Sequence, residues 1–306
     1  MSAQPGKRRL AVNGLLLLDK SAAISSQMAV TRVKSLFDAA KAGHTGTLDP
    51  MATGLLPVTF GEATKFSHAM LEADKAYLAT VRLGMTTTTG DLEGEVLTRT
   101  PVDADPQRVE AALARFRGDI VQTPPMYSAL KHAGRPLYEY ARAGTQVARA
   151  PRHVTIRALE LRHCDATDVQ ISVVCSKGTY IRVLAEDIGK TLGCGATLAE
   201  LRRTHVGGFS LGQAVTLERL SAMTVAERLA RLLPADALLA GLPSLDLDAE
   251  QALRIVRGQA VNCTGFMNTG LVRVYGPDSA FLGVADADPE GRVVPRRLLS
   301  SAAVRA

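Results

Sequence analysis

The sequence has no apolar run long enough to cross a membrane as a helix. The longest run near its start, Gly14–Leu18, is ended at once by Asp19 and Lys20, whereas a spanning helix needs about 20 apolar residues. No small-residue cleavage site follows the run, so it is not a signal peptide. We therefore expect no membrane association, and we interpret this run as a buried strand.

Cysteines are few, and they lie far apart. No C-x-x-C pair occurs and no histidine stands at zinc-ligand spacing, which argues against a zinc site or a disulfide framework. The sequence also lacks the G-x-x-x-x-G-K-[ST] pattern of nucleoside triphosphatases. We expect a cytoplasmic protein without a metal site. The four cysteines are Cys164, Cys175, Cys194 and Cys263.

The chain is long enough for two domains. It has 306 residues, of which 46% are hydrophobic, and its formal net charge is +6. Composition changes around residues 232–247, so we expect a larger domain over 1–240 and a smaller one over 241–306. Basic residues at Lys7–Arg9 predict a loose N-terminal arm. The positive charge is compatible with nucleic-acid binding but does not establish it.

Strands and helices are mixed along the chain without a regular βαβ repeat. Alternating apolar residues predict a long strand over Lys75–Met85, and apolar periodicity predicts a helix over Ile181–Leu192. Prolines and cations interrupt every regular pattern between about residues 123 and 152, which indicates an irregular insertion. The mixture is typical of an α+β fold rather than a doubly wound sheet.

One segment, Gly43–Pro57, combines rigidity with a carboxylate. Three glycines and two prolines occur in its fifteen positions, and these residues hold a loop in one conformation. A rigid loop that presents a lone carboxylate, Asp49, suits a nucleophile or base that must be held in place. From the residues alone, an ordinary Asp-Pro turn with His44 on the surface remains an open alternative.

The segment Gly43–Pro57 closely resembles the active-site motif of the TruB family of tRNA pseudouridine synthases. Further blocks resemble the family's other motifs, in family order. They are G-L-L-L-L-D-K-S-A-A-I-S-S from Gly14, D-K-A-Y from Asp74, P-M-Y-S-A-L-K from Pro125, C-S-K-G-T-Y-I-R from Cys175, L-R-R-T from Leu201 and G-R-V-V-P-R-R-L from Gly291. One position departs from the pattern, because Thr88 stands where the family usually has an aspartate, while Asp91 keeps the later acidic position.

The resemblance implies a fold and an activity. The fold would be the pseudouridine synthase fold, a mixed, mainly antiparallel sheet flanked by helices, with a small C-terminal β-rich domain that is PUA-like. The activity would be isomerisation of uridine 55 in the T-loop of tRNA, by base flipping and without a cofactor. Asp49 would be the catalytic residue, and Arg182 would keep its carboxylate ionised and aimed. Attack at C1′, attack at C6 and removal of a ribose proton all remain open as the role of Asp49.

The resemblance also assigns residues around the substrate. Tyr77 would stack on the flipped base, Tyr180 and Leu201 would line the pocket, and His44 would fill space near the nucleotide. Lys20 would shape the site or meet the RNA backbone. Cations would bind the RNA in the insertion and after it, at Lys131, Arg135, Arg142, Arg149, Arg152, Arg202 and Arg203.

Two rival functions stay open. A tRNA-folding chaperone would bind the same RNA and use its catalysis only secondarily. A relative that depends on a guide RNA would need another RNA to find its target, although this chain has its own basic insertion and lacks long basic tails. For the favoured reading we expect tRNA, through its T-arm, as the partner of a monomer that needs no other protein.

Overall fold

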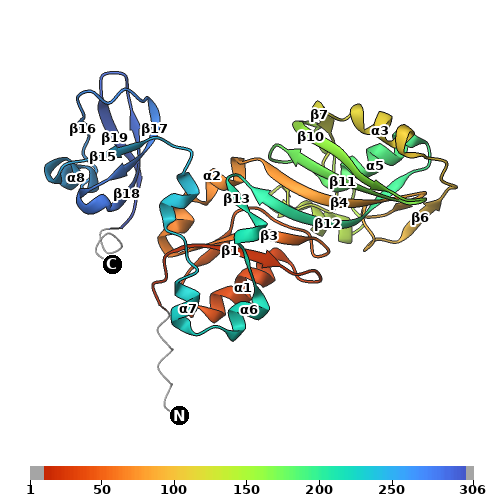
Figure 1. Ribbon diagram of the computed structural model, residues 1–306, viewed down its shortest axis with the longest axis horizontal. Coiled ribbons are helices and arrows are strands. Elements are labelled where there is room, and N and C mark those ends of the chain that lie inside the picture. Colours follow the sequence, from red (N-terminus) through yellow and green to blue (C-terminus); the bar gives the residue numbers. More distant parts are fainter. Residues whose placement is uncertain (1–9, 301–306) are drawn as a thin grey trace, which may run out of the picture.

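The computed structural model describes residues 10–300 as a large body that carries a smaller one (Figure 1). The large body contains a long, curved mixed sheet, and the small body, blue in Figure 1, is a separate β domain. The predicted basic arm at Lys7–Arg9 lies outside the described residues. Within residues 10–300, no helix combines the length and apolar character that crossing a membrane requires.

In the described part of the chain, the large sheet has ten strands in the order β14-β1-β3-β12-β4-β11-β10-β7, with β2 on β3 and β13 on β12. Only the β1–β14 and β3–β12 pairs are parallel, so the expected mixed, mainly antiparallel sheet is confirmed. The strands are β1 (Gly14–Lys20), β2 (Ala42–His44), β3 (Thr53–Phe60), β4 (Lys75–Leu83), β7 (Gly118–Gln122), β10 (Arg152–Cys164), β11 (Asp168–Cys175), β12 (Ala196–Val206), β13 (Phe209–Ser210) and β14 (Val215–Thr216).

Strand β4 follows the predicted alternation, with Ala79, Val81 and Leu83 buried on one face. Strand β12, by contrast, was not predicted, although it lies between β3 and β4 in the centre of the sheet. Its register shifts between Leu198 and Glu200, and such a bulge interrupts the period-two pattern from which a strand is predicted.

Helices cover the buried face of the sheet, and α5 packs there with Ile181, Leu184 and Ile188 in the main core. The segment that follows β3 is a 3₁₀ turn, η1 (Gly61–Phe66), that continues as α2. The helices of the large body are α1 (Ser26–Leu36), α2 (Ser67–Glu72), α3 (Pro106–Ala114), α5 (Ile181–Leu192), α6 (Leu217–Ala222) and α7 (Val225–Leu229). Two further 3₁₀ turns are η2 (Leu211–Gln213), before α6, and η3 (Ala235–Leu239), after α7.

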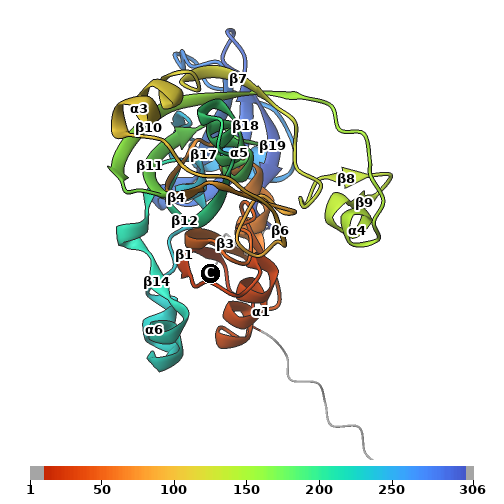
Figure 2. The same cartoon turned by 90° about the vertical axis from the view of Figure 1, so that its right-hand side faces the viewer.

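The insertion at residues 123–152 projects away from the sheet (Figure 2). It was predicted to be irregular, but it contains a two-stranded ribbon of β8 (Lys131–His132) and β9 (Arg135–Pro136) followed by α4 (Leu137–Arg142). A second ribbon, of β5 (Met85–Thr87) and β6 (Val96–Arg99), follows β4.

The C-terminal β domain has its own five-stranded sheet in the order β15-β17-β18-β19-β16 and its own apolar core. Helix α8 begins after Asp248, whose side chain accepts a hydrogen bond from the Gln251 N–H, as expected of a helix N-cap. The elements are β15 (Ser244–Asp246), α8 (Ala249–Val256), β16 (Val261–Asn262), β17 (Gly270–Tyr275), η4 (Pro277–Ser279), β18 (Phe281–Ala287) and β19 (Arg292–Leu298).

Candidate active site

The loop between β2 and β3 carries Asp49 and is held in place by hydrogen bonds from α1 and β1. Ser26, at the start of α1, donates its hydroxyl to the Leu48 carbonyl at 2.9 Å and accepts the Leu48 N–H at 2.8 Å. The buried Lys20 ammonium donates to the carbonyls of Ile24 at 2.7 Å and Pro50 at 3.3 Å. Both residues that flank Asp49 are therefore fixed by α1 and β1.

Strand β12 supports the other end of this loop through Arg203. Its guanidinium donates to the carbonyls of Leu55 at 2.7 Å, Gly46 at 3.1 Å and Thr47 at 3.4 Å. The backbones also touch, because a Cβ on Gly54 would lie 2.3 Å from the Arg203 carbonyl oxygen, and Gly54 has a φ of +101°. Only glycine fits such a conformation and approach.

Two of the proposed RNA contacts need correction. Arg203 is only 2% exposed and Lys20 is fully buried, and both donate to backbone carbonyls of the Asp49 loop and its surroundings. Neither cation is therefore presented to a phosphate backbone. Of the two roles expected for Lys20, shaping the site is the one that the geometry supports, and Arg203 has the same role.

Arg182, in the first turn of α5, forms an ion pair with Asp49. Its Nε donates to Asp49 Oδ2 at 3.0 Å, and the side chain is 4% exposed while that of Asp49 is 35% exposed. Its two terminal nitrogens donate to the carbonyls of Thr89 at 2.9 Å and Tyr127 at 2.7 Å. One buried guanidinium thus joins the Asp49 loop, the loop before β6 and the root of the insertion.

A second carboxylate, that of Asp91, also lies beside Arg182. The distance from Arg182 Nε to Asp91 Oδ2 is 3.6 Å, and Asp91 is buried. Its carboxylate also accepts hydrogen bonds from the Thr89 hydroxyl and the Glu93 N–H. Asp91, the acidic position of the family pattern that this sequence retains, is therefore the one that contacts Arg182. Thr88, which departs from the pattern, accepts the Glu95 N–H through its hydroxyl at 3.1 Å.

Burial sets the pKa values of the central groups. Desolvation raises the pKa of Asp49, Arg182 opposes that increase, and Asp91 adds to it. Burial raises the pKa of Tyr77, so its phenol is neutral at neutral pH. Burial and then the Arg203 charge lower the pKa of His44, which leaves a neutral imidazole that accepts the Gly46 N–H at Nδ1.

The predicted pocket residues come together around one cavity of about 370 Å³, which is lined by Asp49, Tyr77, Tyr180, Arg182 and Leu201. His44, at the end of β2, does not line this cavity. Gln122 fixes Tyr180 by accepting its N–H at 3.1 Å and donating to its carbonyl at 3.3 Å. A volume of this size suits a small organic group such as a nucleobase.

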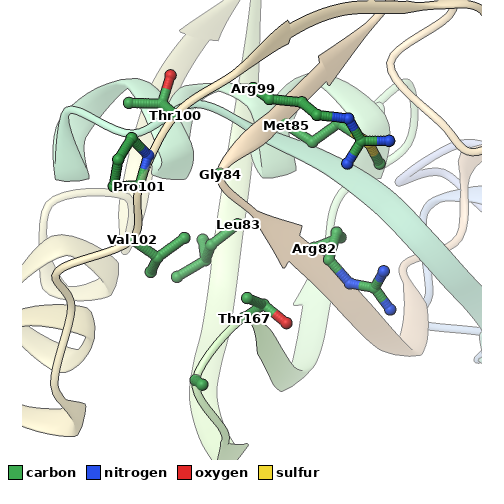
Figure 3. A pocket seen from close by; sticks show the side chains of 10 residues that line it. Arg82, Leu83, Gly84, Met85, Arg99, Thr100, Pro101, Val102 and Thr167 are labelled. Atoms are coloured by element: carbon green, nitrogen blue, oxygen red, sulfur yellow. The ribbon is translucent and has the colours of Figure 1, made fainter.

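Another cavity, of about 540 Å³, lies at the far end of β4 (Figure 3). It is lined by Arg82, Gly84 and Arg99 with apolar neighbours and contains none of the predicted site residues. Its larger size therefore does not identify it as the reaction site, since the carboxylate and aromatic groups converge elsewhere.

The cations of the insertion lie outside the cavity that contains Asp49. Arg135 and Arg142 stand over the rings of Tyr140 and Tyr138, at 5.2 and 5.4 Å from the ring centroids. Lys131 and Arg152 are exposed, and Arg149 donates to the Pro124 carbonyl at 3.2 Å.

Arg202 occupies a different place from Arg203, its neighbour. Residues that follow one another in a strand point to opposite faces, and Arg202 lines a cavity other than that of Asp49. Its guanidinium donates to Asp19 at 2.7 Å and to the Thr53 hydroxyl at 3.2 Å. Its part in RNA binding stays a prediction.

Two residues of the pocket were missed from the sequence. Lys75 lines the cavity and donates to the carbonyls of Met70, Leu71 and Ala73, and burial lowers its pKa to about 8. Ser128 lines the cavity as well. Both residues lie in segments that resemble family motifs. The sequence therefore indicated that these positions fit the family pattern, but it did not indicate that they line the pocket. Among residues 10–300, no group of His, Cys, Asp and Glu is arranged to hold a metal ion.

Comparisons with known proteins agree with this geometry. The family profile described as TruB family pseudouridylate synthase (N terminal domain) matches residues 34–181, and two C-terminal profiles of the same family match residues 182–240 and 243–299. A Burkholderia mallei protein named tRNA pseudouridine synthase B is 56% identical over 309 residues, with 99% of each chain covered. The protein of the same name from Methylobacillus flagellatus is 53% identical and covers 95% of this chain and 96% of its own.

Solved structures share the fold. A chain in the crystal structure of a Cbf5–Nop10–Gar1 complex matches with a TM-score of 0.72 at 25% identity, covering 95% of this chain and 86% of that chain. A chain of an H/ACA RNP bound to a substrate RNA containing 2′-deoxyuridine matches with a TM-score of 0.68 at 22% identity, covering 95% and 80%. With the family profiles spanning most of its length, the chain belongs to the TruB family of pseudouridylate synthases, which are isomerases.

Proposed function

We propose that the protein converts uridine 55 in the T-loop of tRNA into pseudouridine. In this isomerisation the N1–C1′ bond breaks, the base turns, and a C5–C1′ bond forms while C5 loses a proton and N1 gains one. The observation that carries the proposal is the Asp49 carboxylate, which a rigid loop and Arg182 hold inside a cavity of nucleobase size. The tRNA substrate follows from the names of the relatives that are 51–57% identical.

Asp49 acts in its ionised form. Its ion pair with Arg182 opposes the desolvation that favours the protonated acid. The carboxylate then serves as the nucleophile at C1′ or C6, or as the base that removes a ribose proton. All three routes need a charged oxygen beside the everted nucleoside, and the arrangement of Asp49 and Arg182 supplies it without a cofactor.

The base reaches this carboxylate by leaving the stack of the T-loop, which costs a few kcal/mol. Tyr77 and Leu201 line the cavity and offer an aromatic and an apolar surface to the flipped base. The cations of the insertion, with Tyr138 and Tyr140 beneath two of them, bind the RNA outside the cavity. Contacts of this kind offset the cost of unstacking.

Replacing Asp49 by asparagine tests the proposal. We expect Asp49→Asn to lower the rate of tritium release from 5-tritiated uridine by roughly 10⁴-fold or more, while its affinity for tRNA stays unchanged. Asp165→Asn, at an exposed acid in the turn between β10 and β11, is the matched control and keeps the wild-type rate. Turnover by Asp49→Asn at the wild-type rate contradicts the assignment.

The same assay separates the rival functions. The wild-type protein alone is given an isolated T-arm hairpin, with no other protein or RNA. Conversion of that hairpin supports a stand-alone tRNA enzyme, and a requirement for added guide RNA would support the guide-dependent alternative. A chaperone that uses catalysis only secondarily predicts that Asp49→Asn still restores misfolded tRNA, which is measured in parallel.

A further inference from the structure

The buried cation Arg203 lies directly opposite Tyr77 in the large sheet. The two residues are paired between the adjacent antiparallel strands β12 and β4, and such partners point to the same face with their Cβ atoms about 5 Å apart. Both side chains line the cavity that contains Asp49. Tyr77 is therefore within reach of both a guanidinium and any group that enters the cavity.

The Arg203 guanidinium forms a side-chain hydrogen bond with the Tyr77 phenol. It also donates to three backbone carbonyls in and around the Asp49 loop. A guanidinium has more N–H groups than these three carbonyls use, so one that remains is available to the phenol. Arg203 thus holds the loop and contacts Tyr77 at the same time.

The hydrogen bond between Arg203 and Tyr77 can have only one direction. An arginine side chain donates and cannot accept, so the Tyr77 oxygen is the acceptor and its own proton points elsewhere. In the part of the chain that the structure describes, Arg203 is the one group hydrogen-bonded to this phenol. Burial raises the pKa of Tyr77, so the proton is present at neutral pH. The O–H is therefore left to donate to a group that enters the cavity.

The chemistry of the base indicates which group this proton meets. Negative charge develops on the uracil ring whether Asp49 attacks C1′, attacks C6 or removes a ribose proton. The carbonyl oxygens of the base share that charge, and a charged acceptor forms a stronger hydrogen bond than a neutral one. A donor whose direction is already fixed stabilises the charge without reorganising at that moment.

We infer that Arg203 fixes the Tyr77 hydroxyl as a hydrogen-bond donor to a carbonyl oxygen of the reacting base. Arg203 is thus a positioning residue that acts through Tyr77, in addition to its support of the Asp49 loop. This inference rests on the proposed function and deepens it, because it gives the phenol a polar role beside the aromatic surface that its ring offers.

A double-mutant cycle separates this role of Arg203 from its support of the loop. Single-turnover conversion of a T-arm hairpin is measured with and without Tyr77→Phe in the wild type, in Arg203→Gln and in Ser26→Ala. We expect loss of the hydroxyl to slow the wild type roughly 3- to 10-fold, the effect of one hydrogen bond. It should slow Arg203→Gln by less than roughly twofold, because the two residues are coupled. Ser26→Ala, the matched control, weakens the same loop from α1 and should keep the full effect of Tyr77→Phe.

A fluorine label at position 77 supplies a readout that loop support does not affect. The ionisation of 3-fluorotyrosine at this position is followed by fluorine NMR in the protein without RNA. The Arg203 charge lowers the pKa of Tyr77, so Arg203→Gln should move the titration to higher pH. Arg203→Lys, which keeps the charge, should move it less, and Ser26→Ala should leave it in place.

The direction of the hydrogen bond is also tested with Arg203 intact, so the test does not depend on the folding of Arg203→Gln. At a pH where its phenol is neutral, 3-fluorotyrosine at position 77 donates more strongly and accepts more weakly than tyrosine, so conversion should be faster. An equal or slower rate overturns the inference, as does equal slowing by Tyr77→Phe in the wild type and in Arg203→Gln, or a titration that Arg203→Gln leaves unmoved. Absence of product from the wild-type protein would instead remove the proposed function itself, which keeps the two failures distinct.

Discussion

Asp49 and Asp91 share one guanidinium, and this arrangement affects how the Asp49 carboxylate titrates. Arg182 lies 3.0 Å from Asp49 and 3.6 Å from Asp91. Burial raises the pKa of Asp49, Arg182 opposes this, and the neighbouring charge of Asp91 raises it further. The shared cation orients both acids but only partly offsets the desolvation of Asp49.

The shared cation predicts a pH profile. Activity requires ionised Asp49, so the rate should fall as pH decreases through a pKa that lies above the ordinary value for aspartate. Asp91→Asn removes a charge that raises this pKa, so the acid limb should move to lower pH. The plateau rate should fall by roughly 10- to 100-fold, because Arg182 loses its second carboxylate and Asp49 is less well positioned.

Single-turnover rates across the acid range measure both effects. Glu95→Gln, which neutralises an exposed acid close to Asp91 in sequence, serves as the control and should leave the limb in place. An acid limb that stays where it is in Asp91→Asn would show that the Asp91 charge does not act on Asp49.

At the scale of elements, the insertion and β12 contribute differently to the site. The insertion carries exposed cations and two arginine–tyrosine stacks away from the cavity. Strand β12 is central, and its Arg203 and its close contact with Gly54 hold the Asp49 loop. Cations that look alike in the sequence are therefore exposed to solvent in one element and support the interior in the other.

The insertion predicts a salt-dependent affinity for RNA. Affinity should decrease steeply between about 50 and 200 mM salt, because each phosphate contact releases counterions. The double variant Lys131→Gln/Arg142→Gln should bind more weakly and show a salt slope that is smaller by roughly 1.5. Filter binding of T-arm RNA measures this, with Arg108→Gln/Arg115→Gln, in α3 and at its C-cap, as the charge-matched control. A slope equal to that of the wild type would remove these cations from the RNA interface.

At the scale of the whole molecule, the two bodies are joined by a shared apolar cluster. It includes Leu15, Leu55 and Phe66 from the large body together with Phe281 and Val284 from the C-terminal β domain. Polar contacts accompany it, because Lys65 donates to the Leu298 carbonyl at 3.0 Å and Tyr275 donates to Asp236 at 2.7 Å. A joint with both apolar and polar contacts holds the domain in a defined position.

Phe281 tests this joint. Its ring lies 5.5 Å from those of Phe66 and Tyr275 between centroids. Because Phe281 is partly exposed, Phe281→Ala should cost about 2 kcal/mol, less than a fully buried phenylalanine. We expect the C-terminal domain to unfold at a lower temperature, as a separate calorimetric transition, and affinity to fall for whole tRNA but not for the T-arm hairpin. Phe281→Leu should retain one transition, and a single unshifted transition in Phe281→Ala would contradict the role of this ring.

The sequence by itself determined the α+β class, the Asp49 loop and the family, because glycine, proline and motif residues act over short stretches of chain. It also placed Arg182, Tyr77, Tyr180 and Leu201 in the family's motifs, and the structure shows all four around the cavity of Asp49. Local patterns were sufficient for these residues.

Only the tertiary structure decided which cations are buried and which polar groups have partners. Arg202 and Arg203 are adjacent in sequence, yet the pleat of β12 turns one toward Asp19 and the other into the Asp49 loop. The sharing of Arg182 between Asp49 and Asp91 likewise depends on segments far apart in the chain. Burial and hydrogen-bond satisfaction are properties of these long-range contacts, so no short stretch of sequence contains them.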